Sequence, residues 1–172
     1  MVVQKTAAEM NYGLSLPHRK MEDWRWTDLR QLVDKPYPPR QTVVAAAKDV
    51  ERLLRSSPFA KVGGARMVFV NGRYAAELSQ LKNDTVTSTI NVDEPVITMN
   101  AAFATDGACL KISGTVDTPI ELLFITTNAA ARTIATRNVV EIEQGAAATL
   151  IETHLGEGSY LSNSVTQIRV GE

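Results

Sequence analysis

The sequence predicts an α+β fold, with a small helical region over residues 1–60 followed by short β-strands over residues 61–172. Three observations support this prediction. Residues 42–57 repeat apolar side chains at helical spacing, Asn71 and Gly72 form a hairpin signal, and the segments that follow are rich in Val, Ile and Thr. Because helical and strand patterns occupy different parts of the chain, we expect two differently built regions.

The helical signal is clearest in TVVAAAKDVERLLRSS, residues 42–57. Thr42 is the predicted N-cap, and Pro58 is expected to end the helix. The segment DKPYPPRQ just before it is too rich in proline to be helical throughout and predicts a connector. The apolar positions that recur at helical spacing are Val43, Ala46, Ala47, Val50, Leu53 and Leu54.

Strand signals dominate after residue 61, and no further helix is predicted there. In ARMVFVNGRYAAELS, the Asn71-Gly72 pair suits a type I′ turn, which requires positive φ at both central residues. DGACLKISG is echoed by QGAAATLIETHLG, which would make Gly107 and Gly145 equivalent. Short strands with glycine at their corners favour a β-solenoid, but a β-sandwich would give similar runs.

Composition and charge exclude several functional classes. The net charge of −1 gives no general attraction to nucleic acid, and the single cysteine, Cys109, excludes a disulfide framework or a cysteine-rich metal site within this chain. No apolar run reaches the roughly 20 residues of a membrane span, and MVVQKTAAEM lacks the features of a signal peptide, so we expect a cytoplasmic protein. The absence of the P-loop and G-x-S-x-G motifs argues against an ATPase or a serine hydrolase.

The segment LPHRKMEDWRWTDLRQL resembles the N-terminal signature of the SufB/SufD family of iron–sulphur cluster assembly proteins, and specifically its SufD branch. The hairpin MVFVNGRYAAELS, with Asn71 and Gly72, resembles the hairpin of that branch. NAAFATDGACLKI, PIELLFIT and RNVVEIEQGAAATLIETHLG are similar to successive coils of the family's β-helix. The signature positions matched in the first segment are Leu16, Pro17, Glu22, Trp24, Arg25, Trp26, Thr27, Asp28 and Leu29.

This resemblance implies a fold and a role. The family fold has an N-terminal helical region, a right-handed parallel β-helix and a C-terminal helical region, and this chain resembles only the first region and the first coils. The implied role is a non-enzymatic scaffold subunit of the SUF complex, which pairs with a sister SufB subunit and a SufC ATPase through regions largely absent here. The cluster and the flavin belong to the assembled complex, and no catalytic, cofactor-binding or metal residue is carried over to this chain.

Two alternatives to the scaffold role follow from the strand pattern. SVTQIRVGE leaves the last predicted coil without a cap, so a free-standing β-solenoid module could self-associate through its open edge. A carbohydrate-active β-helix would need paired carboxylates on one face, and the acidic residues after residue 61 are scattered.

Five residues could carry chemistry, and each has a structural interpretation that we favour. Trp24 and Trp26 are predicted to be buried anchors rather than base-stacking platforms, because acidic residues are interleaved with the cations around them. Cys109, among small and apolar neighbours, is predicted to be a buried inert thiol.

Glu152 and His154 alternate along a predicted strand and therefore share one face. They could begin a carboxylate–imidazole metal site or an acid–base pair. Two candidate ligands are too few for a full site, and the other histidine, His18, is remote in sequence. A hydrogen-bonded surface pair is therefore the favoured interpretation.

Overall fold

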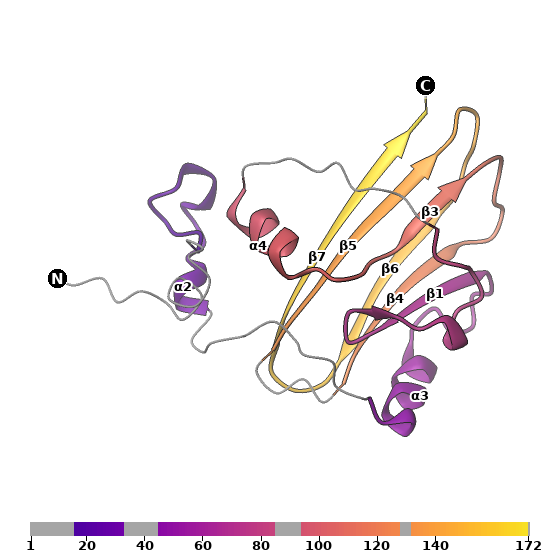
Figure 1. Cartoon of the computed structure of the whole chain (residues 1–172), viewed down its shortest axis with the longest axis horizontal. Coiled ribbons are helices and arrows are strands. Elements are labelled where there is room, and N and C mark those ends of the chain that lie inside the picture. Colours follow the sequence, from indigo (N-terminus) through magenta and orange to yellow (C-terminus); the bar gives the residue numbers. More distant parts are fainter. Residues whose placement is uncertain (1–15, 33–44, 85–93, 128–131, 172) are drawn as a thin grey trace.

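The computed structural model describes residues 16–32, 45–84, 94–127 and 132–171. They form a mixed arrangement of short helices and two sheets rich in parallel strands (Figure 1). None of the helices in these ranges is long and apolar enough to cross a membrane. In chain order the elements are η1 (Glu22–Trp24), α2 (Leu29–Leu32), α3 (Ala47–Ser56), β1 (Ala65–Val70), β2 (Arg73–Tyr74), η2 (Ala76–Leu78), α4 (Pro95–Phe103), β3 (Cys109–Ile112), β4 (Ile120–Thr126), β5 (Arg132–Ile142), β6 (Leu150–Gly156) and β7 (Tyr160–Val170).

From β3 onward, successive strands alternate between the two sheets. The first sheet has the order β2-β1-β4-β6 and the second the order β3-β5-β7. Among the described strands, only β1 and β2 pair antiparallel, and the pairings β1–β4, β4–β6, β3–β5 and β5–β7 are all parallel. Ile120 pairs with Leu150 and Cys109 with Val139, an offset of 30 residues in both sheets. These parallel ladders differ from the antiparallel sheets of a β-sandwich.

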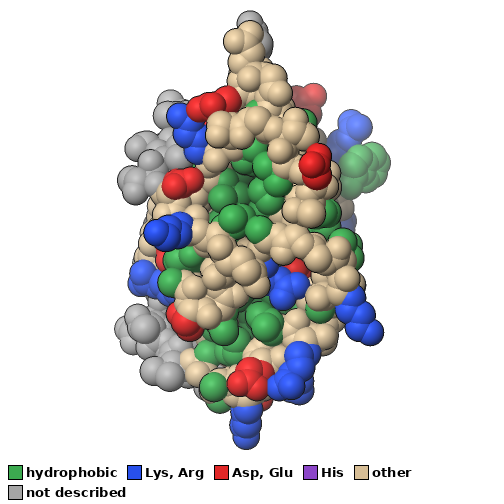
Figure 2. Space-filling model, turned by 90° about the vertical axis from the view of Figure 1, so that its right-hand side faces the viewer, with side chains coloured by type: hydrophobic (Ala, Val, Ile, Leu, Met, Phe, Trp, Pro, Cys, Tyr) green, Lys and Arg blue, Asp and Glu red, His purple; other side chains and the backbone are tan. Residues whose placement is uncertain are grey.

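The main core lies between the facing surfaces of the two sheets. Equivalent residues lie side by side in register, with Met67 beside Leu122 and Phe69 beside Phe124. In the view of Figure 2, hydrophobic side chains gather in the hollow middle of one face, and most of the charged side chains surround them. The buried members of this core are Met67, Phe69, Ala108, Leu110, Ile112, Ile120, Leu122, Phe124 and Val140.

Helix α3 covers the outer surface of the first sheet and ends at Ser56, just before Pro58 as predicted. Val50 and Leu53 pack in one cluster with residues of β1 and β4. The helix begins later than predicted, because its N-cap is Ala46; the predicted N-cap, Thr42, lies outside the described residues. Since α3 lies on one face and the main core on the other, β4 is buried along its whole length. A strand covered on both faces explains the continuous apolar run of IELLFIT.

A buried carboxylate ties the segment after α3 to this sheet. Glu121 of β4 is only 5% exposed and pairs with Arg66, its neighbour in the β1–β4 register. The carboxylate also accepts hydrogen bonds from the hydroxyls of Ser57, at 2.7 Å, and Thr153, at 2.9 Å. A buried ion is tolerated when it has a counter-charge and additional hydrogen bonds, and Glu121 has both.

The prediction that no helix follows residue 61 is wrong, because α4 lies against the second sheet (Figure 1). Glu94 caps it by accepting a hydrogen bond from the backbone N–H of Val96. Asn100 is fully buried, and its amide donates to the backbone oxygens of Thr136, at 2.9 Å, and Asn163, at 2.8 Å. The sequence PVITMNAAF is apolar almost all round, so it carries no amphipathic period by which a helix could be predicted.

The hairpin prediction is confirmed. Asn71 and Gly72 have φ angles of 55° and 78°, as a type I′ turn requires. Asn71 also extends the contact between β1 and β4, because its N–H donates to Ile125 O at 2.7 Å and its side-chain oxygen accepts from the Thr127 N–H at 2.9 Å. The turn therefore fixes the end of the β1–β4 pair as well as the hairpin itself.

The predicted equivalence of Gly107 and Gly145 is wrong. Gly107 precedes β3 of the second sheet, whereas Gly145 precedes β6 of the first. A parallel bridge between Thr115 and Ala147 instead pairs the segment after Gly145 with the segment after Gly114. The two echoed sequences look alike because both place a glycine and small residues before a strand, and that local pattern does not say which sheet the strand joins.

The two glycines also have different structural roles, which predicts different effects of substitution. A Cβ atom at Gly107 would lie 2.0 Å from the backbone oxygen of Arg137, whereas one at Gly145 would meet open space with φ at +73°. Gly107→Ala should therefore lower the free energy of unfolding by about 3 kcal/mol or more, the upper end of overpacking costs. Gly145→Ala, the control, should cost about 1–2 kcal/mol from backbone strain alone. Urea unfolding of both variants measures this, and equal losses would contradict the close approach of Gly107 to β5.

Candidate functional site

The structure places the predicted signature residues in two separate parts of the fold. Asn71 and Gly72 form the β1–β2 turn, and the other signature residues lie in and around η1 and α2. Pro17 is fully buried, and its carbonyl accepts a hydrogen bond from the Leu29 N–H at 3.0 Å. The Asp28 carboxylate accepts from the backbone and the guanidinium of Arg30. These contacts close residues 17–30 into a compact loop, which we call the signature loop, while Glu22 and Thr27 stay exposed.

The two tryptophans do not behave alike. Trp26 is 82% exposed, with the Arg25 guanidinium 5.2 Å from the centre of its ring, so its predicted burial is wrong. Trp24 is half-buried, and its indole N–H donates to the Glu94 carboxylate at 3.3 Å. Because Glu94 caps α4, Trp24 links the signature loop to the helix that covers the second sheet. Trp24 therefore anchors this loop through a hydrogen bond, whereas the burial predicted for it is only partial.

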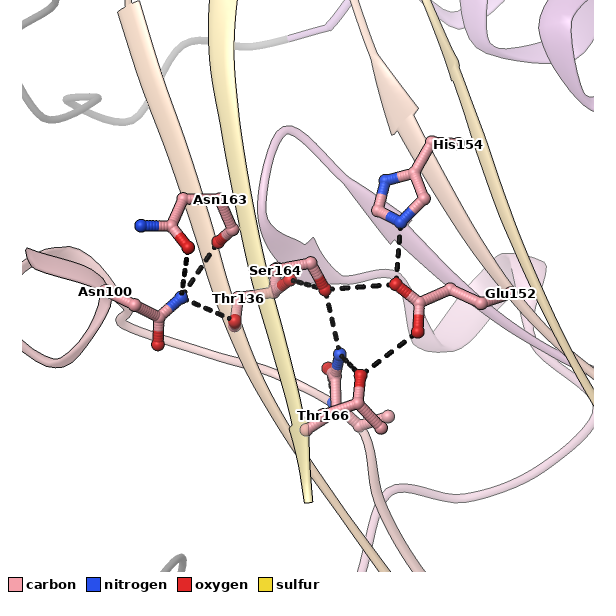
Figure 3. Close-up of polar contacts among 9 residues, drawn as sticks. Asn100, Thr136, Glu152, His154, Asn163, Ser164 and Thr166 are labelled. Atoms are coloured by element: carbon pink, nitrogen blue, oxygen red, sulfur yellow. Dashed lines mark hydrogen bonds and ion pairs between the residues drawn. The ribbon is translucent and has the colours of Figure 1, made fainter. Parts of the chain in front are cut away.

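Among the described residues, β6 carries a carboxylate and an imidazole in direct contact. Glu152 and His154 point to the same side of the strand, and the Glu152 Oε1 and His154 Nε2 atoms are 2.7 Å apart (Figure 3). Their side chains are 35% and 40% exposed, respectively. The favoured interpretation of a hydrogen-bonded pair is therefore confirmed.

These two residues occupy positions that belong to the core ladders in the neighbouring strands. In register, Glu152 follows Met67 and Leu122, and His154 follows Phe69 and Phe124. The aromatic ladder continues through the imidazole, because the Phe124 and His154 rings stack with centroids 4.8 Å apart and planes 14° apart. The interior surface of the first sheet thus changes from apolar to polar at β6.

The second sheet provides the partners that this change requires. The hydroxyls of Ser164 and Thr166 on β7 donate to the two oxygens of Glu152, at 3.2 Å and 3.0 Å (Figure 3). The amide of fully buried Asn138 on β5 donates in turn to both hydroxyls, at 3.1 Å and 3.0 Å. We use the name lumen cluster for the group of side chains that meet here between the two sheets and link β6 to β5 and β7. Its members are Glu152, His154, Asn138, Ser164 and Thr166.

The lumen cluster holds Glu152 in its ionised form. The hydrogen bond with His154 lowers the pKa of this carboxyl most, and the hydroxyls of Thr166 and Ser164 lower it further, against the opposing effect of burial. An ionised carboxylate bonded to an imidazole can orient the ring, accept a proton or bind a cation. Within the described ranges no three His, Cys, Asp or Glu side chains come together as a metal-binding group.

Sequence reasoning missed three members of the lumen cluster. Asn138, Ser164 and Thr166 come from strands other than that of Glu152, and only the register between β5 and β7 brings them together. The alternation of Ser164 and Thr166 on one face of β7 was the available signal, but alternating small polar residues are also typical of any solvated strand.

Cys109 lies apart from this cluster, on β3. It is half-buried rather than buried, and its backbone N–H donates to the Asn83 side chain at 2.7 Å. It lines a surface pocket together with Asp84, Asp106 and Arg137. Because the sequence has one cysteine, it cannot by itself supply the several thiolates that an iron–sulfur cluster normally requires.

The lowered pKa of Glu152 predicts a pH dependence of stability. A carboxyl with a folded-state pKa below its unfolded value of about 4.3 stabilises the fold above that pH, and the stabilisation disappears as the pH falls through the folded-state value. The expected contribution is below about 1 kcal/mol, because the group is one-third exposed. In Glu152→Gln, the free energy of unfolding should fall less than in the parent as the pH is lowered from about 5 to 3. Glu77→Gln, at an exposed position outside the cluster, is the control. An equal fall in the parent and in Glu152→Gln would contradict the prediction.

Comparison with known proteins adds evidence on family. No family model matches the chain. An iron–sulfur cluster assembly SufBD family protein of Synechocystis sp. strain PCC 6803 is 27% identical over 204 residues, covering 96% of this chain and 44% of that protein. The chain thus spans less than half the length of this relative, and the similarity does not distinguish SufB from SufD. Along nearly its whole length, the chain is similar to part of a SufBD family protein of iron–sulfur cluster assembly.

Proposed function

We propose that this chain is a non-enzymatic scaffold subunit, SufD-like, of a SUF-type iron–sulphur cluster assembly complex. The observation that carries the proposal is the similarity to a SufBD family protein over 96% of the chain. The residues of the signature loop and of the Asn71-Gly72 hairpin support it, since they follow the family order along the sequence.

In this proposal the two parallel sheets are the first coils of a right-handed β-helix. The parallel pairing and the common offset of 30 residues in β3–β5 and β4–β6 support a coil that repeats along the chain. The chain would act in the cytoplasm as a rigid platform that positions its partners, a SufB-like sister subunit and a SufC-like ATPase. The cluster would be assembled by the complex, on groups that this chain does not supply.

Affinity capture tests the scaffold role. The tagged product of the full reading frame that encodes these residues should retrieve an ATPase and a second SufB/SufD-like protein from an anaerobic lysate of its own host. An unrelated tagged protein of similar size and charge serves as the control. Retrieval of neither partner, from a lysate in which both are detected, would overturn the scaffold role.

A second candidate function, a self-associating interaction module, is favoured by the outer edge of β7. This strand is 11 residues long, contains no proline or glycine, and has one charged side chain, Arg169. Natural edge strands are usually protected by charges, prolines or covering segments. Two apolar side chains of β7, Ile168 and Val170, are 53% and 67% exposed. In register they lie beside Val140 and Ile142 of β5. The β7 edge therefore has the chemistry to pair with a strand of a second copy.

Charge substitution on this edge tests the second candidate. In sedimentation velocity, the chain should show a mass that rises with concentration, and Ile168→Lys should restore the monomer. Val62→Lys is a matched control, because Val62 has the same exposure of 53% but lies away from β7. A parent chain that is monomeric at all concentrations, or dispersed equally by Val62→Lys, would argue against association through the β7 edge.

A further inference from the structure

We propose that Glu152 and His154 form a binding site for a divalent transition-metal ion, with Glu152 Oε1 and His154 Nε2 as the protein ligands and water in the remaining positions. This inference does not depend on the proposed scaffold role, since it rests on the lumen cluster alone. It concerns an exchangeable two-ligand site, which differs from a closed structural site with four protein ligands.

The strand geometry brings the two ligand atoms together. Residues two apart on a strand point to one face, and here the prospective ligand atoms are 2.7 Å apart. Metal–nitrogen and metal–oxygen distances of about 2.0–2.2 Å require ligand atoms roughly 3 Å apart. The ion would therefore fit if the distance between the two ligand atoms increased by a few tenths of an ångström. Both side chains are more than one-third exposed, which leaves room for that movement and for water ligands.

The surroundings of the pair orient both ligands. The Ser164 and Thr166 hydroxyls hold the Glu152 carboxylate, and the buried Asn138 amide holds those hydroxyls. Stacking on Phe124 holds the imidazole ring. Outer partners of this kind fix ligand direction in metal sites, and their loss typically lowers metal affinity by about 10–100-fold.

The ligand types select the class of ion. Imidazole nitrogen suits Zn²⁺, Co²⁺, Ni²⁺ or Fe²⁺, whereas Ca²⁺ and Mg²⁺ prefer sites made of oxygen atoms. Binding to Nε2 displaces the proton shared with Glu152. In a neutral ring this proton is replaced by one at Nδ1, which lies on the side of the ring away from Glu152 and makes no hydrogen bond to the described part of the chain (Figure 3). In a protonated ring, the Nε2 proton is released to water.

Cobalt titration followed by NMR tests the site directly, because the chain has only two histidines. Adding Co²⁺ to the folded chain should shift and broaden the ring signals of His154 before those of His18. His154→Gln and Glu152→Gln should each weaken Co²⁺ binding at least tenfold, as measured by calorimetry. Thr166→Val, which keeps the side-chain shape but removes one hydroxyl from the carboxylate, should weaken it about tenfold. His18→Gln is the matched control and should leave the affinity unchanged.

Two results would overturn the proposed site. If the His18 signals respond first, or if His154→Gln binds Co²⁺ as the parent does, the ion is held elsewhere and the proposed site is wrong. The titration of the parent chain decides between these outcomes even if a variant fails to fold, because it needs no substitution. Circular dichroism of each variant establishes which calorimetric results can be interpreted.

Discussion

The burial of β4 on both faces is the constraint on which the rest of the structure depends. Its interior side chains fill the core between the sheets, and its outer side chains pack beneath α3. Each fully buried Leu, Ile or Phe contributes about 1.5–3 kcal/mol relative to an exposed one, so this strand alone accounts for a large part of the apolar driving force. Its neighbours are set by it, since β1 pairs on one edge and β6 on the other.

The same constraint explains why the one charged residue of β4 is so extensively paired. Glu121 lies on the α3 side, where water is excluded, and its carboxylate is held by Arg66, Ser57 and Thr153. These partners come from β1, from the segment after α3 and from β6. A buried charge with several partners favours one register over its alternatives, because a slip by one residue would leave the charge unpaired. Glu121 thus adds specificity to a strand whose stability comes from apolar burial.

At β6 the interior ladders change character, and this change creates the candidate site. Glu152 and His154 stand where apolar side chains stand in β1 and β4, and hydroxyls of β7 replace the apolar partners. Polar groups at core positions are tolerated because each has a hydrogen-bond partner. Positions that break the core pattern while keeping hydrogen-bond partners are where function is expected. The Glu152–His154 pair, at the strand where the ladders change, is therefore the candidate site.

Local patterns were sufficient for some features of this protein. Asn71 and Gly72 determined a type I′ turn because few residues adopt positive φ, and Pro58 determined the end of α3 because proline cannot continue a helix. The two-residue period of a strand also determined that Glu152 and His154 share a face.

Other features were decided only by the tertiary structure. The helix α4 has no amphipathic period, and its place depends on the buried Asn100, which bonds to two different strands. Trp26 is exposed although tryptophan is usually buried, and Gly107 and Gly145 belong to different sheets although their sequences look alike. The hydroxyl partners of Glu152, Ser164 and Thr166, come from a strand that follows it in the chain but lies in the other sheet. Local conformation follows from short-range sterics and hydrogen bonds, whereas sheet membership, burial and the lumen cluster depend on which distant strands meet, and the sequence does not encode that choice in any single segment.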